Sequence, residues 1–322
     1  MQRRLRGHQM NRSWIQGLGV AIAVMLAIVV IDSVPRRSSD GQMEQYMLPG
    51  LHTELGKVEK IVLVGRETTS TLQLNDGKWT VAERYQLEAK FEKLASLLKT
   101  LADSKLKERK TRKPENFDVL GVNAEEATEI KVVTPDGRYS VLAGNSDQKR
   151  KGQYVRLFEG EAVANQVWLT DQVVDISSSP ADWLEDEIID VEADRIQEIS
   201  YTQEQEVLGV VRQDGQLKIS DLPADAELRY SSVVDTLGRA LSNVRMQDVL
   251  PAAEIDFSGA GYARFRLEDD LEIKIQLVER AGKYWIQLLD HAKSEWAYEV
   301  NRIAYENLTK RLGDLLKQES EE

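Results

Sequence analysis

The feature that most constrains this chain is an apolar run over residues 14–31, in which Gln16 is the one polar side chain. As a helix the run would rise about 27 Å at ~1.5 Å per residue, which matches the ~30 Å hydrocarbon core of a bilayer. We therefore predict a transmembrane anchor at residues 14–31. Residues 1–13 would form a short tail before it, and residues 32–56 a polar tether after it.

Arginines around the run predict its orientation. Four precede it and two follow it, so the positive-inside rule places the N-terminus in the cytoplasm. The chain would then be a single-pass protein of the inner (cytoplasmic) membrane with a periplasmic body. A cleaved signal peptide is the alternative, but its apolar region is shorter, about 7–15 residues, and ends at a small-residue site. A start at Met10 would remove three leading arginines and leave the orientation to Arg12 and the new amino terminus.

Charge and cysteine content exclude several classes of function. The formal net charge is −12, and the basic N-terminal segment makes the remaining body more acidic still. Such a body repels phosphate backbones, so we expect no nucleic-acid partner. The chain has no cysteine, which excludes disulfides, thiol catalysis and Cys-ligated zinc.

Beyond the tether, one order of strand and helix patterns occurs twice. Each copy has an alternating strand, a hairpin turning at Asp-Gly, an amphipathic helix with apolar residues spaced 4, 3, 4, 3, four further strands and a short closing helix. In the first copy the strands are expected at 58–64, 71–74, 78–81, 129–133, 139–142, 152–157 and 167–169, and the helices at 87–101 and 171–176. In the second copy the strands are expected at 193–199, 207–211, 216–219, 264–267, 271–275, 282–287 and 296–300, and the helices at 230–244 and 302–317.

These patterns predict an α+β fold. An N-terminal transmembrane helix would be followed by two similar, duplicated modules of mostly antiparallel β-sheet, each with a packed amphipathic helix covering the sheet. A serine run ending at Pro180 breaks regular structure and marks the junction. We place the first module at residues 57–180 and the second at 181–322.

The sequence contains no motif for catalysis, and we predict that the protein is not an enzyme. Its three histidines form no ligand pair, and neither a G-x-S-x-G elbow nor a P-loop is present. We therefore expect no catalytic residue, cofactor or metal site. The acidic stretch at 182–190 has the composition of a calcium loop or an acid/base pair, but lacks the spacing of a calcium loop. We interpret it as the solvated face of a connector.

A basic cluster at residues 105–113 is the candidate contact surface on this acidic body. Its six cations could dock on anionic headgroups or on an acidic partner, and the alternative is a solvated helix end whose dipole favours cations. The turn at 148–151 has the same two interpretations. The six candidate contact residues are Lys105, Lys107, Arg109, Lys110, Arg112 and Lys113.

Taken in order, these landmarks resemble the bacterial envelope family catalogued as domain of unknown function 4340. The matching segments are the anchor, the first strand, the Leu-rich helix and the motifs D-G-K-W-T-V (76–81), L-G-V (120–122), Q-Y-V-R-L (153–157) and A-D-W-L (181–184). The resemblance implies an accessory protein encoded beside gliding-motility-type ABC transporters, and it implies no catalytic residue.

On that basis we expect a non-enzymatic, membrane-anchored scaffold whose partners are the permease and ATPase subunits of an ABC-type complex or another envelope protein. One alternative is a module that binds an envelope polysaccharide through its tryptophans. A less favoured one is a hydrolase that uses the carboxylates at 182–190.

Overall fold

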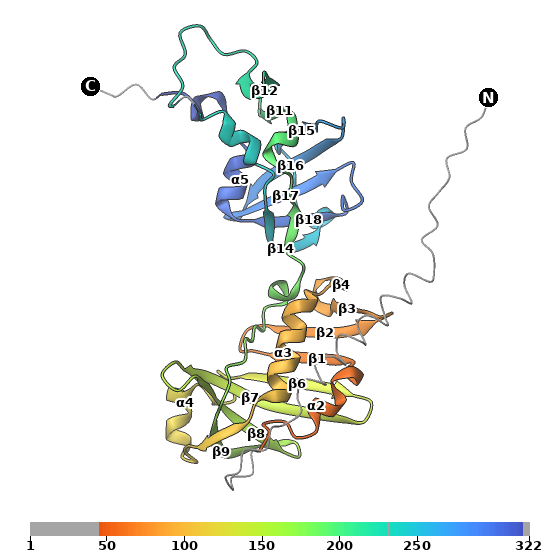
Figure 1. Cartoon of the computed structure of the whole chain (residues 1–322), viewed down its shortest axis with the longest axis vertical. Coiled ribbons are helices and arrows are strands. Elements are labelled where there is room, and N and C mark those ends of the chain that lie inside the picture. The colour runs from red at the N-terminus through yellow and green to blue at the C-terminus, as the bar shows by residue number, and fades with distance from the viewer. Residues whose placement is uncertain (1–44, 231, 318–322) are drawn as a thin grey trace, which may run out of the picture. The chain divides into compact units, whose positions relative to one another are not determined.

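The computed structural model of the chain describes residues 45–230 and 232–317, which fall into two compact units (Figure 1). The first unit ends at Glu185 and the second begins at Asp186. The predicted tail, the anchor at 14–31 and most of the tether lie outside the described residues. Over the two described ranges, no helix is long and apolar enough to cross a membrane.

A nine-stranded antiparallel sheet forms the framework of the first unit. Its strand order is β4-β3-β2-β1-β6-β7-β8-β9-β5. The strands are β1 (Lys60–Val64), β2 (Thr69–Asn75), β3 (Lys78–Val81), β4 (Leu87–Glu88), β5 (Leu106–Arg109), β6 (Thr128–Thr134), β7 (Gly137–Asp147), β8 (Gly152–Glu159) and β9 (Ala162–Thr170). The α-helices are α2 (Leu51–Glu54), α3 (Phe91–Asp103) and α4 (Phe117–Leu120), with short 3-10 turns η1 (Leu55–Lys57), η2 (Ala82–Arg84), η3 (Pro114–Asn116) and η4 (Pro180–Trp183).

The second unit is also built on a nine-stranded antiparallel sheet, in the order β10-β14-β18-β17-β16-β15-β11-β12-β13. Its strands are β10 (Glu187–Ile189), β11 (Ile196–Gln203), β12 (Glu206–Gln213), β13 (Gln216–Ile219), β14 (Val244–Pro251), β15 (Gly261–Leu267), β16 (Glu272–Arg280), β17 (Lys283–Leu289) and β18 (Trp296–Val300). Its described helical segments are α5 (Arg302–Leu308) and the 3-10 turns η5 (Ala193–Arg195), η6 (Asp235–Arg239), η7 (Ala252–Glu254) and η8 (Leu312–Asp314). The prediction of mostly antiparallel sheet is confirmed for both units.

Eight strands follow each other in the same order in the two sheets. Read across the first sheet from β3 the order is β3-β2-β1-β6-β7-β8-β9-β5, and across the second from β13 it is β13-β12-β11-β15-β16-β17-β18-β14. The short strands β4 and β10 have no counterpart in this alignment. The Asp-Gly hairpins also agree, since Asp76 and Gly77, like Asp214 and Gly215, have φ between 48° and 81°. Positive φ at both central residues is what a two-residue type I′ turn needs.

In the first unit, one face of the sheet is buried beneath α3 (Figure 1). Alternate residues of β1, Ile61 and Leu63, are fully buried, and so are Leu94 and Leu101 on the apolar stripe of the helix. The 4, 3, 4, 3 spacing of that stripe therefore predicted both the helix and its buried face correctly. The helix begins at Phe91 and not at residue 87, because Leu87 pairs with Val81 as part of β4.

In the second unit, the α-helix expected at 230–244 is wrong. The described residues of this segment form turns and the 3-10 turn η6, and β14 already begins at Val244. Val234, Leu237 and Leu241 are nevertheless buried, so the apolar spacing predicted which side chains enter the core but not the backbone. Gly238 explains part of the difference, because glycine weakens an α-helix. A Cβ atom at this position would lie only 3.1 Å from the side chain of Leu217.

Of the two expected closing helices, the one at 171–176 is wrong. The chain there is irregular, held by hydrogen bonds from Thr170 Oγ1 to the carbonyl of Gln172 (2.6 Å) and from the amide of Val174 to Gln153 Oε1 (3.0 Å). Side chains from the sheet thus replace the helical bonds. The helix expected at 302–317 is shorter than predicted, and consists of α5 and η8.

Candidate functional site

The basic cluster at 105–113 lies on the outermost strand of the first sheet. Helix α3 ends at Asp103, before the cluster begins. The cluster consists of β5 and the residues on either side of it, so the interpretation as a helix end is wrong. β5 pairs with β9 through Leu106↔Thr170 and Arg109↔Trp168. The pairing continues past the strand, with Lys110 N–H donating to the carbonyl of Val167 at 2.9 Å.

The six cations differ in what they contact. Lys110 is nearly buried, with a 14% exposed side chain, and pairs with Glu108 at 2.6 Å. The guanidinium of Arg109 lies 5.0 Å from the centre of the Trp168 ring, and the ammonium of Lys105 lies 5.7 Å from that of Tyr46.

The remaining three cations of the cluster are exposed. Arg112 donates to Gln166 Oε1 at 2.8 Å, and the ammonium of Lys107 lies 3.5 Å from the carbonyl oxygen of Arg150. Lys113 has no side-chain partner within the described part of the chain. Lys107, Arg112 and Lys113 are therefore the cations most available to a partner.

The structure joins this cluster to the second basic segment, at the turn between β7 and β8. Arg150 pairs with Glu108 at 3.4 Å, and Lys107 reaches the Arg150 carbonyl, although these residues are more than 40 positions apart in the sequence. The register β7-β8-β9-β5 produces this contact, and sequence reasoning treated the two segments separately. We call the joint surface the basic edge, formed by Lys105, Lys107, Arg109, Lys110, Arg112, Lys113, Lys149, Arg150 and Lys151.

The turn that carries Arg150 is held by one carboxylate. Asp147 accepts hydrogen bonds from the backbone amides of Lys149 and Arg150, both at 3.1 Å, and from the hydroxyl of Tyr154 at 2.9 Å. The Arg150 amide is the largest of the effects that hold the pKa of Asp147 below its ordinary value of 3.8. The turn is therefore positioned by bonds that persist at neutral pH.

A small groove adjoins the basic edge. Its volume is about 400 Å³, and its lining includes Lys110, Arg150, Leu120, Tyr154 and the 80% exposed Val119. The floor belongs to a satellite apolar cluster that includes Leu120 and Tyr154. The site thus offers cations around an apolar depression, an arrangement suited to binding an acidic segment with one apolar anchor.

The acidic stretch at 182–190 does not gather its carboxylates into a site. Asp186 pairs with Arg245 at 2.8 Å, and Asp190 accepts the amide of Asn243 at 2.9 Å. Trp183 is fully buried and donates its indole N–H to the carbonyl of Ser177 at 2.7 Å. Across the described ranges, no group of three or more His, Asp or Glu side chains could hold a metal ion.

Comparison with known proteins identifies the family. The sequence model of the family described as domain of unknown function (DUF4340) matches residues 79–261. No curated protein and no solved structure matches the chain. The match begins within β3, includes the helix α3 and the basic edge, and ends at the first residue of β15, so it spans more than half of the 322 residues. This chain belongs to the DUF4340 family, a domain of unknown function.

Proposed function

We propose that the protein is a non-enzymatic accessory component of an ABC-type transport complex, anchored in the inner membrane with its two units in the periplasm. The observation that carries this proposal is the basic edge, a surface on which two distant segments of an acidic chain concentrate nine cations. The membrane part rests on the apolar run at 14–31 and its flanking arginines. The choice of a transport complex as the partner rests on the family resemblance of the sequence.

Charge distribution supports a docking role for the basic edge. The chain has a pI of about 5.0, so most of its surface repels an acidic partner. A partner with an acidic segment is therefore steered toward the one strongly basic surface that we find among the described residues. The adjoining groove at Val119 would then accept an apolar side chain of the same segment.

The other two functions receive less support from the geometry. A polysaccharide site needs exposed aromatic faces. Of the four tryptophans considered for it, Trp183 and Trp285 are at most 4% exposed, and Trp79 and Trp296 are half-buried. A hydrolase needs carboxylates that face one another, whereas Asp186 and Asp190 have separate structural partners. We therefore retain the accessory role.

We also infer that the two units are copies of one module. The shared order of eight strands and the shared Asp-Gly turns support this. In both units the last strand of the common order, β5 or β14, leads into a segment that builds a small apolar cluster, with Phe117 in the first unit and Phe257 in the second.

Copurification tests the proposal. The full chain with a C-terminal tag is extracted from membranes in mild detergent, and the proteins that accompany it are identified by mass spectrometry. We expect permease and ATPase subunits in stoichiometric amounts. The triple variant Lys107→Glu, Arg112→Glu and Lys113→Glu should reduce their yield at least tenfold, since each reversal removes an attraction and adds a repulsion of ~0.5–1 kcal/mol.

A matched variant separates docking from net charge. Three exposed cations of the second unit are reversed in the same way, namely Lys218→Glu, Lys293→Glu and Lys317→Glu. This control should copurify the subunits as the wild type does. If the protein is extracted alone, the accessory role is wrong. If both triple variants lose the subunits equally, the basic edge is not the docking surface.

A further inference from the structure

A second and larger groove lies on the first sheet, and the proposed docking role does not use it. Its volume is about 1000 Å³, and β1, β6, β7 and β8 contribute to its lining. In β1 and β6, Ile61 and Val132 are buried on the face that packs on the core. Because side chains alternate along a strand, the neighbouring Val62 and Val133 point to the opposite face. Phe158 of β8 lies on the same face, because its neighbour Leu157 is opposite the buried Val141, and adds apolar surface to the groove.

Two cations flank this apolar surface without a partner. Lys60 lies opposite Val133 in the register of β1 and β6, and Val133 lies opposite Arg138 in that of β6 and β7. The three side chains therefore form one row, with the two cations on strands about 10 Å apart, two strand spacings. Both cations are exposed, and neither forms a hydrogen bond or ion pair through its side chain with any residue that the structure describes.

The second unit carries the opposite pattern at the equivalent position. There the row reads Glu198, Arg266, Glu272 across β11, β15 and β16. Glu198 accepts two bonds from Arg266, at 2.9 and 3.1 Å, and pairs with Arg264 at 3.3 Å.

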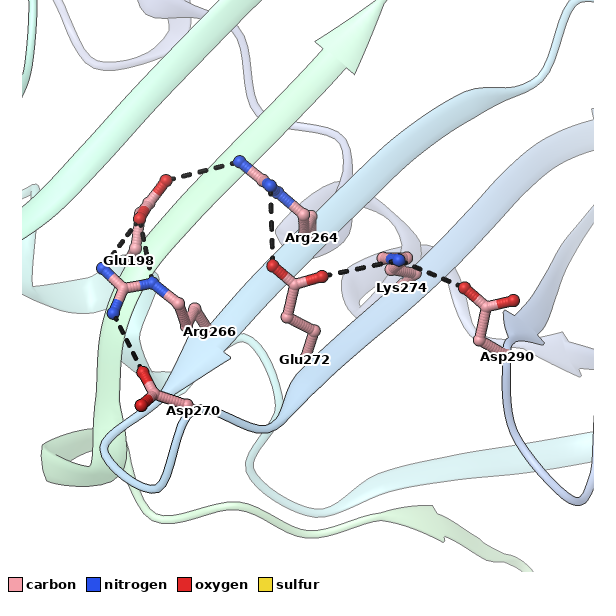
Figure 2. Close-up of polar contacts among 7 residues, drawn as sticks. All are labelled: Glu198, Arg264, Arg266, Asp270, Glu272, Lys274 and Asp290. Atoms are coloured by element: carbon pink, nitrogen blue, oxygen red, sulfur yellow. Dashed lines mark hydrogen bonds and ion pairs between the residues drawn. The ribbon is translucent and has the colours of Figure 1, made fainter.

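Further ion pairs extend this row into a ladder. Glu272 pairs with Arg264 at 3.6 Å and with Lys274 at 3.4 Å, and Lys274 pairs with Asp290 at 3.1 Å. Figure 2 shows these side chains as one continuous chain of contacts, which also includes Asp270. The face of the second unit thus neutralises its own charge, whereas that of the first unit has Lys60, Val133 and Arg138 in the same row.

The chemistry of the row selects a ligand. Two cations about 10 Å apart can both reach one carboxylate or phosphate above Val133, because each side chain extends several ångströms from its strand. The apolar side chains next to that point are only half-buried, so covering them with a hydrocarbon chain is favourable in free energy. A ligand with one anionic head and one hydrocarbon chain satisfies both parts.

We propose that this groove binds a single-chain lipid whose anionic head lies between Lys60 and Arg138 and whose chain lies along Val62, Val133 and Phe158. The other charged residues of the lining are Glu129, Lys131 and Glu161. Glu129 is paired with Lys131 at 3.0 Å, so that pair is neutral toward the ligand. Glu161 forms no hydrogen bond or ion pair with any residue that the structure describes, and its charge opposes an anionic head.

Photolabelling of the full chain tests the proposal. The protein is reconstituted in nanodiscs of phosphatidylcholine and exposed to palmitate with a diazirine in its chain, and labelled peptides are identified after irradiation. We expect label on peptides from β1, β6 and β8. The methyl ester of the same probe, which lacks the charge, should label at least tenfold less. Glu161→Gln should increase labelling by palmitate.

Two variants locate the anionic head. Lys60→Glu, Val133→Arg and Arg138→Glu together place the row of the second unit on the first, a pattern that this fold already accommodates, and should reduce labelling at least tenfold. Lys60→Arg with Arg138→Lys keeps both charges and should label normally. Because neither variant alters the basic edge, both should still copurify the transport subunits, so failure of one proposal is distinguishable from failure of the other.

Three results would overturn the lipid proposal. One is equal labelling by palmitate and its methyl ester, which would show adhesion through the chain alone. Another is undiminished labelling of the triple variant. The third is a competition result in which an apolar-acidic peptide prevents labelling and unlabelled palmitate does not. That result would assign the groove to a polypeptide.

Discussion

At the scale of single residues, close packing beneath the basic edge depends on Gly152, the first residue of β8. A Cβ atom at this position would overlap the carbonyl oxygen of Thr170 on β9. The same pair of strands is joined by the Thr170 hydroxyl, which accepts the amide of Gln153 at 3.0 Å. The approach of β8 to β9 is therefore set by the absence of a side chain, and β9 in turn carries β5.

We expect Gly152→Ala to destabilise the first unit by about 1–3 kcal/mol, because the added methyl group must push two bonded strands apart. Gly137→Ala is the control, since a Cβ there meets nothing within 4 Å and φ is not positive. That variant should change stability by less than about 0.5 kcal/mol. Denaturant unfolding of both variants measures the difference, and equal stability would contradict the packing argument.

At the scale of elements, the turn between β7 and β8 presents Lys149, Arg150 and Lys151 together, held by hydrogen bonds to Asp147. Its stability depends on ionised Asp147, whose pKa is lowered chiefly by the bond from the Arg150 amide. A carboxyl group with a lowered folded pKa stabilises the fold above its unfolded pKa and loses that contribution as pH falls through the folded pKa.

The turn should therefore loosen as the pH falls below about 4, because Asp147 becomes protonated only beneath its ordinary pKa of 3.8. Hydrogen exchange at the amides of Lys149 and Arg150, corrected for intrinsic rates, should accelerate in that range. Asp147→Asn should exchange faster already at pH 7 and show little further change on acidification. A wild type whose protection at these two amides does not vary between pH 7 and pH 3 would refute this role.

At the scale of the whole molecule, two sheets with one strand order carry different surfaces. The first unit has the basic edge and a groove with unpaired Lys60 and Arg138, while the equivalent row of the second unit is closed by the Glu198–Arg266 contact. Two sheets with the same strand order allow one unit to keep a self-neutralised face while the other presents charge to a partner. This division of roles places both proposed ligands on the first unit.

The orientation of the whole chain is testable because it contains no cysteine. Lys293→Cys, an exposed position of the second unit, should react in intact cells with a maleimide that does not cross the inner membrane. His8→Cys should react only after lysis, as the arginines around residues 14–31 predict. Purified protein that lacks the His8→Cys site altogether would instead show that a signal peptide is cleaved.

The fold was predictable from the sequence where local patterns decide it. Alternation gave the strands, and Asp-Gly at 76–77 and 214–215 gave the hairpins, because only certain residues tolerate positive φ. The same reasoning failed at 230–244 and 171–176. There the apolar spacing or the repeated order of elements predicted a helix, and contacts with the rest of the sheet decided the backbone.

The sequence by itself determined the apolar run, the acidic body, the repeated strand order and the six cations at 105–113. Only the tertiary structure brought Arg150 to Lys107 and Glu108, and set Lys60 beside Val133 and Arg138. The physical reason is that strand pairing joins residues far apart in the chain. Register fixes which side chains share a row, and no local pattern specifies the register between distant strands.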